Sequence, residues 1–257
     1  MKIIIDKSNK ELKNIFTQKI TFQPIIPLNI FQTWETKNLP FYMNNCVESI
    51  KRNNPEFEHY LFDDEDCELF IKEFFPKIVL KAYNKLIPGA YKADLWRLCV
   101  LYIYGGIYLD IKFHCIKPFK LIYLTDKEYY VNDWNKNTKK FDIKMSDRIY
   151  NGFMICQQKN PLLLKMIHKI VENVNNNFYG RGCLHPTGPK LLNSFFNKNE
   201  KINFQLNLFA PKENKTFIRY GLLKILGMYK KYRTEQKLNS SKKHYSILWN
   251  NRKIYKN

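Results

Sequence analysis

Two pairs of charged residues, Asp94 with Arg97 and Asp110 with Lys112, have types and spacings that could do chemistry. Asp94 and Arg97 lie three residues apart, so on a helix both side chains leave the same face. Asp110 and Lys112 come at the end of a short apolar segment. An arginine fork matches the geometry of oxyanions, and a lysine ammonium can neutralise a phosphate as a point charge. A surface ion pair between Asp94 and Arg97 is the alternative interpretation.

A helix, a glycine turn and a strand are needed to hold these four residues. The apolar run from Asp94 to Tyr104 predicts the helix, Gly105-Gly106 end it, and residues 107–111 form the strand. The rest of the pattern predicts strands at 28–33, 57–62, 128–131 and 153–157, and helices at 8–19, 41–53, 65–75, 76–86, 161–175 and 186–197. Strands that alternate with helices favour an α/β fold with a mostly parallel sheet. Such sheets bind nucleotides in the crevice at the carboxyl ends of their strands.

Length and composition predict one globular domain. The chain has 257 residues, of which 45% are hydrophobic, enough for a large core. No run of 18 uncharged apolar residues occurs, so a membrane span is not expected. Six cysteines stand singly, without a CxxC pair, which favours reduced thiols and a cytoplasmic location.

Positive charge is concentrated at the C-terminal end of the chain. The net charge is +20, and from Lys212 onward 13 Lys and Arg face 2 Glu. An anionic partner such as lipid headgroups, nucleic acid or a phosphorylated acceptor would suit this segment, although a solvated basic face is the alternative. Residues 217–232 predict a helix with one apolar stripe, formed by Phe217, Leu222, Ile225, Leu226 and Tyr229. That helix would lie either on an anionic membrane or against the core.

The stretch from residue 90 to residue 112 reads AYKADLWRLCVLYIYGGIYLDIK. It resembles the pattern A-K-A-D-x-x-R, then L-Y-x-x-G-G-x-Y-x-D-x-D, of the DXD-containing sugar transferases, the family of Och-type mannosyltransferases and bacterial capsule transferases. Further pieces of the family pattern occur in the same order, at residues 26–34, 54–64, 75–83, 151–154, 187–189 and 244–249. The resemblance thus extends from residue 26 to about residue 250. Two positions depart from the pattern: Lys112 replaces the second acid, and Leu248 replaces a serine.

The resemblance implies a GT-A-like, single-domain α/β transferase that acts in polysaccharide biosynthesis or a related pathway. Such an enzyme moves a hexose from a UDP- or GDP-sugar to a hydroxyl of a glycan, lipid or protein, with retention of configuration. It also implies a division of the chain into a lead-in segment (1–25), a donor nucleotide-binding half (26–112), an acceptor half (113–210) and a basic segment that closes the site (211–257).

Individual residues take roles from the same resemblance. Asp94 would accept hydrogen bonds from the donor sugar, Arg97 would contact sugar or phosphate, and Asn151 would lie near the sugar. Asp110 corresponds to the first acid of the DXD motif. The donor nucleotide would be bound by four further residues, Gln32, Thr33, Trp34 and Trp249, with Trp34 stacked on the base.

Lys112 leaves three alternatives open. An ammonium has three donors and no acceptor, so it cannot ligate a cation. Lys112 could itself neutralise the departing diphosphate, or a Mn²⁺ or Mg²⁺ ion could be held by Asp110, His244 and the donor phosphates. The third alternative is an inactive, sugar-nucleotide-binding relative. A basic module that binds nucleic acid or membrane without chemistry is the rival from another class, but it leaves the Asp94, Arg97 and Asp110 arrangement unexplained.

Overall fold

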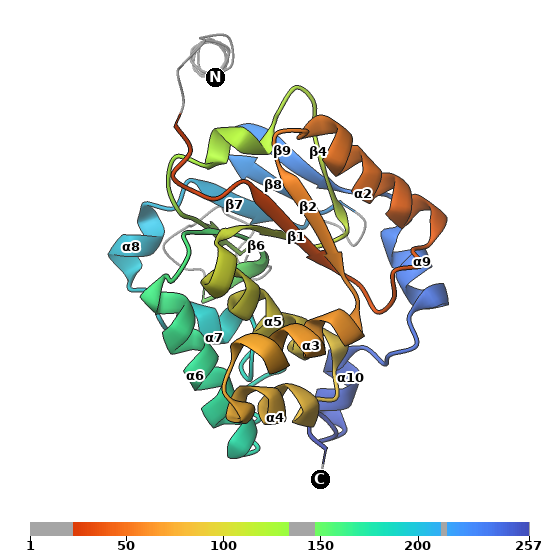
Figure 1. The fold of residues 1–257 in the computed structure, drawn as a ribbon, viewed down its shortest axis with the longest axis vertical. Helices are drawn as coiled ribbons and strands as arrows, with labels where there is room; N and C mark the ends of the chain where they lie inside the picture. The colour runs from red at the N-terminus through yellow and green to blue at the C-terminus, as the bar shows by residue number, and fades with distance from the viewer. Residues whose placement is uncertain (1–22, 134–146, 212–214, 257) are drawn as a thin grey trace.

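A computed structural model describes residues 23–133, 147–211 and 215–256 as an α/β domain built on one large sheet. The described strands follow the order β2-β1-β3-β6-β5-β7-β8-β9-β4 (Figure 1). Their bounds are β1 Asn29–Thr33, β2 Glu58–Phe62, β3 Gly106–Leu109, β4 Phe113–Cys115, β5 Tyr129–Asn132, β6 Ile149–Cys156, β7 Leu206–Phe209, β8 Phe217–Tyr220 and β9 Leu223–Met228. The predicted single-domain α/β class, with a central sheet and flanking helices, is confirmed.

The sheet is mixed, which corrects the expectation of mostly parallel strands. β1 pairs in parallel with β2 and β3, and β5 with β7. The other described pairs are antiparallel, because β6 runs against both β3 and β5 and because β7, β8 and β9 follow one another as hairpins. The parallel part is the one in which helices connect successive strands, and such crossovers are what parallel pairing requires.

Helices cover both faces of the sheet and divide the core in two. Their bounds are α2 Phe41–Asn53, α3 Asp64–Phe74, α4 Lys77–Lys85, α5 Gly89–Tyr104, α6 Pro161–Asn175, α7 Pro189–Asn193, α8 Lys198–Ile202, α9 Tyr232–Asn239 and α10 Tyr245–Asn250. In one core, helices α3, α4, α5, α6 and α7 pack against sheet residues such as Phe31 and Tyr108. The other joins α2 to Ile30, Ile107 and their neighbours on the opposite face. Figure 1 shows α3, α4, α5 and α6 grouped on one side and α2 with α9 on the other.

Helix α5 is longer than predicted and buried around much of its circumference. It begins at Gly89, after Pro88, five residues before the predicted start at Asp94. Gly105 ends it with φ of 63°, and Gly106 continues at φ of 114°. A Cβ atom at Gly106 would lie 2.7 Å from the carbonyl oxygen of Asn29, so glycine lets β3 pack directly beside β1. Asp94 therefore lies in the second turn of the helix.

The predicted helix over residues 217–232 is wrong. These residues form the β8–β9 hairpin, which turns at Gly221 with φ of 54°. Glycine costs stability inside a helix but suits a turn at positive φ, and the buried Ile225 is β-branched, a type enriched in strands. Neither the membrane helix nor the core-packed helix therefore exists. The predicted helix at 8–19 lies outside the described residues.

Most other elements agree with the prediction within a few residues, and α2 and α6 have the predicted bounds. The predicted helix at 186–197 is shorter, because only Pro189–Asn193 is helical. Strands β4 and β7 and helices α8, α9 and α10 were not predicted. Over the part of the chain described here, no helix is long and apolar enough to cross a bilayer.

Candidate functional site

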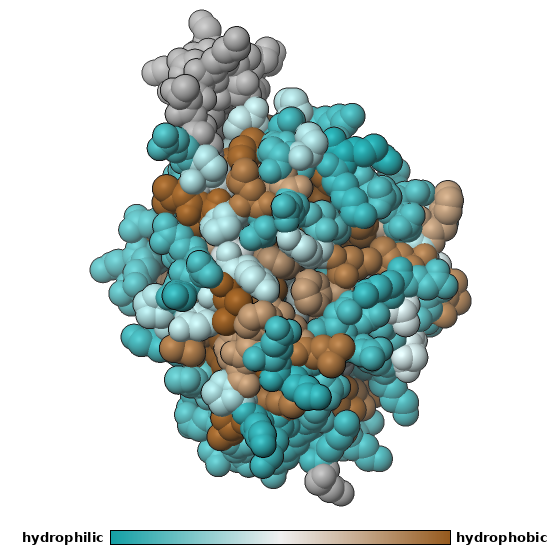
Figure 2. Space-filling view, viewed as in Figure 1, coloured by the Kyte–Doolittle hydropathy of each residue, from teal (hydrophilic) through white to brown (hydrophobic). Residues whose placement is uncertain are grey.

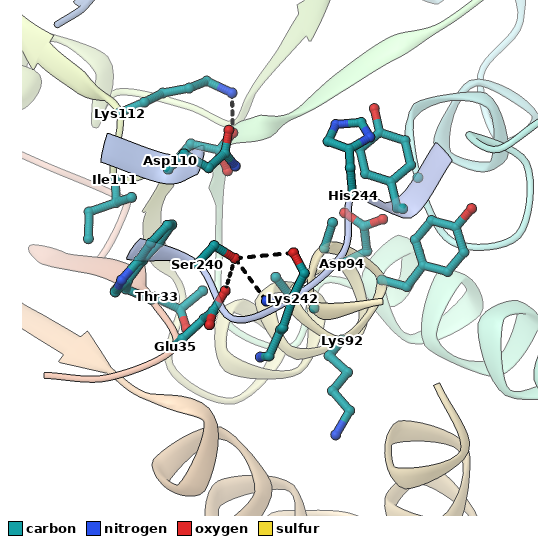
Figure 3. A pocket seen from close by; sticks show the side chains of 18 of the residues that line it. Thr33, Glu35, Lys92, Asp94, Asp110, Ile111, Lys112, Ser240, Lys242 and His244 are labelled. Atoms are coloured by element: carbon teal, nitrogen blue, oxygen red, sulfur yellow. Dashed lines mark hydrogen bonds and ion pairs between the residues drawn. The ribbon is translucent and has the colours of Figure 1, made fainter. Parts of the chain in front are cut away.

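A pocket of about 1130 Å³ lies at the edge of the sheet where β1 and β3 end (Figure 3). Because β1 and β3 are parallel, their carboxyl ends meet there, and antiparallel β6 brings its beginning to the same edge. The first half of α5 and the C-terminal segment from Tyr232 to Tyr245 complete the wall. Eight of the predicted site residues line it: Thr33, Trp34, Asp94, Arg97, Asp110, Lys112, Asn151 and His244.

Asp94 is a buried carboxylate held from three directions. Its Oδ1 atom accepts hydrogen bonds from Asn151 Nδ2 at 2.9 Å, and Arg97 Nη2 lies 3.2 Å away. Its Oδ2 atom accepts a hydrogen bond from the Thr187 hydroxyl at 2.8 Å. Burial raises the pKa of Asp94, although Arg97, Thr187 and Asn151 act in the opposite direction. These contacts come from α5, β6 and the turn before α7, so they fix the carboxylate at the pocket wall.

Arg97 connects the two carboxylates of the site. Its guanidinium donates to the carbonyl oxygens of Ala93 and Asn151, at 3.1 and 2.6 Å, and lies 4.3 Å from the centre of the Tyr108 ring. The Nη1 atom is 3.8 Å from Asp110 Oδ1. Burial alone would lower the pKa of Arg97, but Tyr108 and the two aspartates raise it, so the guanidinium stays charged. The buried position makes Arg97 part of the site wall, unlike a surface ion pair.

Asp110 lies directly after β3 and is surrounded by donors. Oδ2 accepts hydrogen bonds from Lys112 Nζ at 2.8 Å and from the Tyr150 hydroxyl at 2.6 Å, and Oδ1 accepts one from the Tyr108 hydroxyl at 3.1 Å. Burial alone would raise the pKa of Asp110, but Lys112 and Arg97 outweigh it and lower the pKa to about 2. Asp110 is therefore ionised at all ordinary pH values.

The donor set around Asp110 does not fit a divalent metal ion. Lys112 places a positive charge 2.8 Å from Oδ2, which repels a cation at this carboxylate, and an ammonium cannot be a ligand. Within residues 23–133, 147–211 and 215–256, no three His, Cys, Asp or Glu side chains are grouped so that they could hold a metal. His244, the second predicted ligand, uses Nδ1 to accept a hydrogen bond from the backbone N–H of Ser246 at the start of α10. The metal therefore stays a prediction without support from this geometry.

Gly152 explains how two bulky polar groups fit beside Asp110. A Cβ atom at this position would collide with the Asp110 carboxylate and with the Tyr150 hydroxyl. Any larger residue would therefore push Tyr150 away from Asp110. Tyr150 and Thr187, which hold the two carboxylates, were not among the predicted site residues, because no spacing in the sequence links them to positions 40 and 93 residues away.

The residues at the end of β1 separate by strand alternation. Thr33 and Trp34 line the pocket, whereas Gln32 is fully buried outside the lining and its Oε1 atom lies 2.7 Å from His59 Nε2. Successive side chains of a strand point to opposite faces, so Gln32 and Thr33 cannot both face the same side. Trp34 follows the last residue of β1, so this alternation does not determine its side. Trp249 also lies outside the lining, where its indole N–H donates to the Tyr179 carbonyl at 2.8 Å. The structure thus brings two of the four predicted nucleotide-binding residues into the pocket.

The segment from α9 to α10 crosses the pocket as a strap, defined here as residues 232–250. Glu35, just after β1, accepts hydrogen bonds from Ser240 and Ser241, and Figure 3 shows the one from Ser240. Asp64, at the start of α3, forms an ion pair with Lys242. Seven Lys and Arg side chains line the pocket, against four Asp and Glu: the cations are Lys92, Arg97, Lys112, Arg233, Lys237, Lys242 and Lys243. A pocket with this excess of positive charge favours an anionic ligand.

Comparison with known proteins links this geometry to a family. The family model described as "Glycosyltransferase sugar-binding region containing DXD motif" matches residues 40–141. The chain is 33% identical over 98 residues to an initiation-specific alpha-1,6-mannosyltransferase of Candida albicans, a match that covers 36% of this chain and 26% of the relative. It is 27% identical over 178 residues to inositol phosphoceramide mannosyltransferase 3 of Schizosaccharomyces pombe, covering 69% and 46%. These matches thus span about a quarter to a half of the relatives' length.

Among solved structures, the glycosyltransferase PaToxG superposes with a TM-score of 0.48 at 18% identity, over 76% of each chain.

Proposed function

This chain belongs to the DXD-motif glycosyltransferase family, and we propose that it transfers a hexose from a nucleoside-diphosphate sugar to a hydroxyl group of an acceptor. The observation that carries the proposal is the connected set of Asp94, Arg97, Asp110 and Lys112 in one cationic pocket at the carboxyl ends of β1 and β3. Ligands of open α/β sheets bind at this edge. The set lies within the segment that the family model matches.

Each part of the pocket has a role in the proposed reaction. Trp34 offers an aromatic surface for the base, and Asp94 accepts hydrogen bonds from hydroxyls of the transferred sugar. The acceptor oxygen forms a bond to the anomeric carbon while the bond from that carbon to the diphosphate oxygen breaks. The proton of the acceptor hydroxyl passes to the departing diphosphate, and the configuration is retained. Catalysis then depends on positioning and on stabilising the diphosphate charge.

Lys112 takes the place of the second DXD acid and of the metal in this proposal. Its ammonium is held 2.8 Å from Asp110 and lines the pocket, so it is a fixed positive charge. The diphosphate also needs further cations, and Arg233, Lys242 and Lys243 of the strap are the candidates. A Mn²⁺ or Mg²⁺ ion would supply the same charge stabilisation, but the donor set around Asp110 does not fit it.

The sugar and the acceptor are proposed only by class. The two relatives above are named as mannosyltransferases, so mannose is the first hexose to test, with GDP as its carrier and UDP-sugars as the alternative. One relative is named for inositol phosphoceramide, which makes a lipid-linked hydroxyl the first acceptor to test. A cytoplasmic location, peripheral on a membrane face, stays a prediction, and the six free cysteine thiols agree with it.

Calorimetric titration with GDP- and UDP-sugars, each with and without Mn²⁺, tests this function. We expect one nucleotide sugar to bind without Mn²⁺. Lys112→Ala should weaken this binding and the matched variant Lys51→Ala should not, because Lys51 is an exposed lysine of α2 that is not among the residues lining the pocket. Binding that Lys51→Ala weakens as much as Lys112→Ala would contradict the proposal, as would the absence of binding to every sugar nucleotide.

An inactive donor-binding relative is the second candidate, since the Asp110 carboxylate already accepts three hydrogen bonds from protein donors. An active transferase should slowly hydrolyse the bound donor, which can be measured as release of free sugar, whereas an inactive relative should not. Binding without any hydrolysis or transfer would favour the inactive relative. If the chain binds nucleic acid and no sugar nucleotide, and this binding disappears above about 200 mM salt, then the basic module is the better description.

A further inference from the structure

Two of the described large apolar side chains are far more exposed than the rest, and both lie where α2 meets α9. Leu238 is 77% exposed and Phe41 is 70% exposed, and Tyr42, beside Phe41, is 48% exposed. Figure 2 shows hydrophobic residues reaching the surface at the edge where Figure 1 places α2 and α9. We call Phe41, Tyr42 and Leu238 the rim patch. Single exposed apolar residues are common, whereas a group of them needs an explanation.

Buried contacts hold the two halves of the rim patch together. Helix α2 has Pro40 as its N-cap and no capping side chain of its own. Glu235 of α9 supplies the cap instead, because its carboxylate accepts hydrogen bonds from the backbone N–H groups of Tyr42 and Met43, at 2.8 and 3.0 Å. The Tyr229 hydroxyl donates to the same carboxylate at 2.9 Å. The positions of Phe41 and Leu238 are therefore set by a built contact between two helices.

The surface around the rim patch is cationic. Lys230, Lys231, Arg233 and Lys237 are exposed on α9 and on the turn before it. The acids nearby are already engaged by the protein: Glu235 is buried against α2, and Glu35 accepts hydrogen bonds from Ser240 and Ser241. Apolar side chains bordered by Lys and Arg are typical of a surface that enters the headgroup region of an anionic bilayer.

The rim patch also adjoins the mouth of the pocket. Leu238, Lys237 and Arg233 line the pocket, so whatever covers the patch lies beside its opening. We propose that Phe41, Tyr42 and Leu238 insert into the interface of an anionic membrane and hold the pocket mouth against the bilayer. A membrane-bound helix at residues 217–232 was one of two alternatives for that segment, and the proposed contact lies instead on α2 and α9.

Sedimentation with vesicles tests the proposal, in the absence of any sugar nucleotide so that the result does not depend on the proposed function. The chain carries a net charge of +20, so binding to phosphatidylserine vesicles alone is not specific. The discriminating variant is therefore the double change Phe41→Ser with Leu238→Ser. Its matched control is Leu69→Ser with Ile78→Ser, which removes two side chains that are each 52% exposed on α3 and α4.

We expect the wild-type chain to sediment with vesicles that contain phosphatidylserine and not with pure phosphatidylcholine. The rim double variant should bind at least about tenfold more weakly, because two apolar side chains no longer enter the interface, and the control should bind as the wild type does. Lys230→Ser with Lys231→Ser should also weaken binding, which covers the case of a rim variant that fails to fold. Equal losses in rim variant and control would overturn the proposal. So would a concentration-dependent dimer that the rim variant abolishes, since the patch would then be an interface between two copies.

Discussion

The two carboxylates of the site share Arg97 but have opposite electrostatics. Asp94 is held by one cation and two neutral donors, and burial raises its pKa. Asp110 faces two cations, Lys112 and Arg97, and its pKa falls to about 2 although burial acts against this. Burial therefore acts in the same direction on both carboxylates, and the second cation, Lys112, decides whether the pKa rises or falls. A carboxylate that keeps its charge when buried needs enough positive charge around it.

Asp110 and Asp94 therefore have different roles in the site. Asp110 holds Lys112 in place and is permanently ionised, so its contribution is to fix a positive charge at the pocket wall. Asp94 is a hydrogen-bond acceptor fixed by Thr187 and Asn151, which suits the recognition of sugar hydroxyls.

Replacing Asp110 should have the largest effect. Asp110→Asn leaves Lys112 and Arg97 facing a neutral amide, so we expect at least about a hundredfold loss of transfer or donor hydrolysis, and a loss of stability of about 3–5 kcal/mol. The double variant Asp110→Asn with Lys112→Met should recover much of the stability in denaturant unfolding, but none of the activity. Recovery of activity in the double variant would mean that the pair serves folding alone.

Chelation and mutation of Lys112 together test whether Lys112 or a metal ion supplies the positive charge for the diphosphate. If Lys112 provides the charge for the diphosphate, EDTA should leave the wild-type rate unchanged, and Lys112→Ala should lose about a hundredfold, which corresponds to about 3 kcal/mol. Lys112→Asp should then require Mn²⁺, because Asp110 and the new carboxylate offer hard oxygen ligands. Complete loss of the wild-type rate in EDTA would refute this role.

The opposite pKa shifts predict opposite pH dependences of stability. The ordinary pKa of an aspartate is 3.8, and that of Asp110 is about 2 in the folded chain. The stability advantage of wild type over Asp110→Asn should therefore be fully present above about pH 4. As pH falls toward 2, it should shrink by about 2 kcal/mol.

The corresponding comparison for Asp94→Asn should run the other way. A folded-state pKa above 3.8 means that the folded chain takes up the proton more readily than the unfolded chain, so wild type gains stability relative to Asp94→Asn as pH falls. Urea unfolding at a series of pH values measures both differences. Slopes of the same sign would show that the two carboxylates share one environment.

Thr187→Val should have the smallest effect. It removes one hydrogen bond from the Asp94 carboxylate and keeps the shape of the side chain, so we expect a loss of about 1–2 kcal/mol in stability and a rise in donor Kd with little change in the rate at saturation. Ser194→Ala is a suitable control, because the Ser194 hydroxyl donates to the local carbonyl of Leu191 at 2.7 Å and not to a carboxylate of the site. A change in rate at saturation as large as for Asp110→Asn would place Thr187 in the chemistry.

The sequence predicted the N-terminal half well, because local signals there agree with the tertiary structure. Apolar periodicity predicted α2 with its observed bounds, although this helix has no capping side chain of its own, and Gly105-Gly106 predicted where α5 ends and β3 begins. The spacing of Asp94, Arg97 and Asp110 therefore placed these residues correctly at one edge of the sheet. In the C-terminal part the apolar residues near Gly221 fit a helical stripe and a hairpin equally well, and only pairing with β7 decided for the hairpin.

The sequence alone was enough to predict the α/β class, most of the helices and strands between β1 and α6, and the four charged residues that belong together. Tertiary structure alone decided which partners surround them. Tyr150 and Thr187 reach the carboxylates from segments far along the chain, and Glu235 caps a helix that begins almost two hundred residues earlier. Such contacts depend on how the strands are ordered in the sheet and on where the strap crosses it. No local periodicity encodes that order, because it arises from the packing of whole elements against one another.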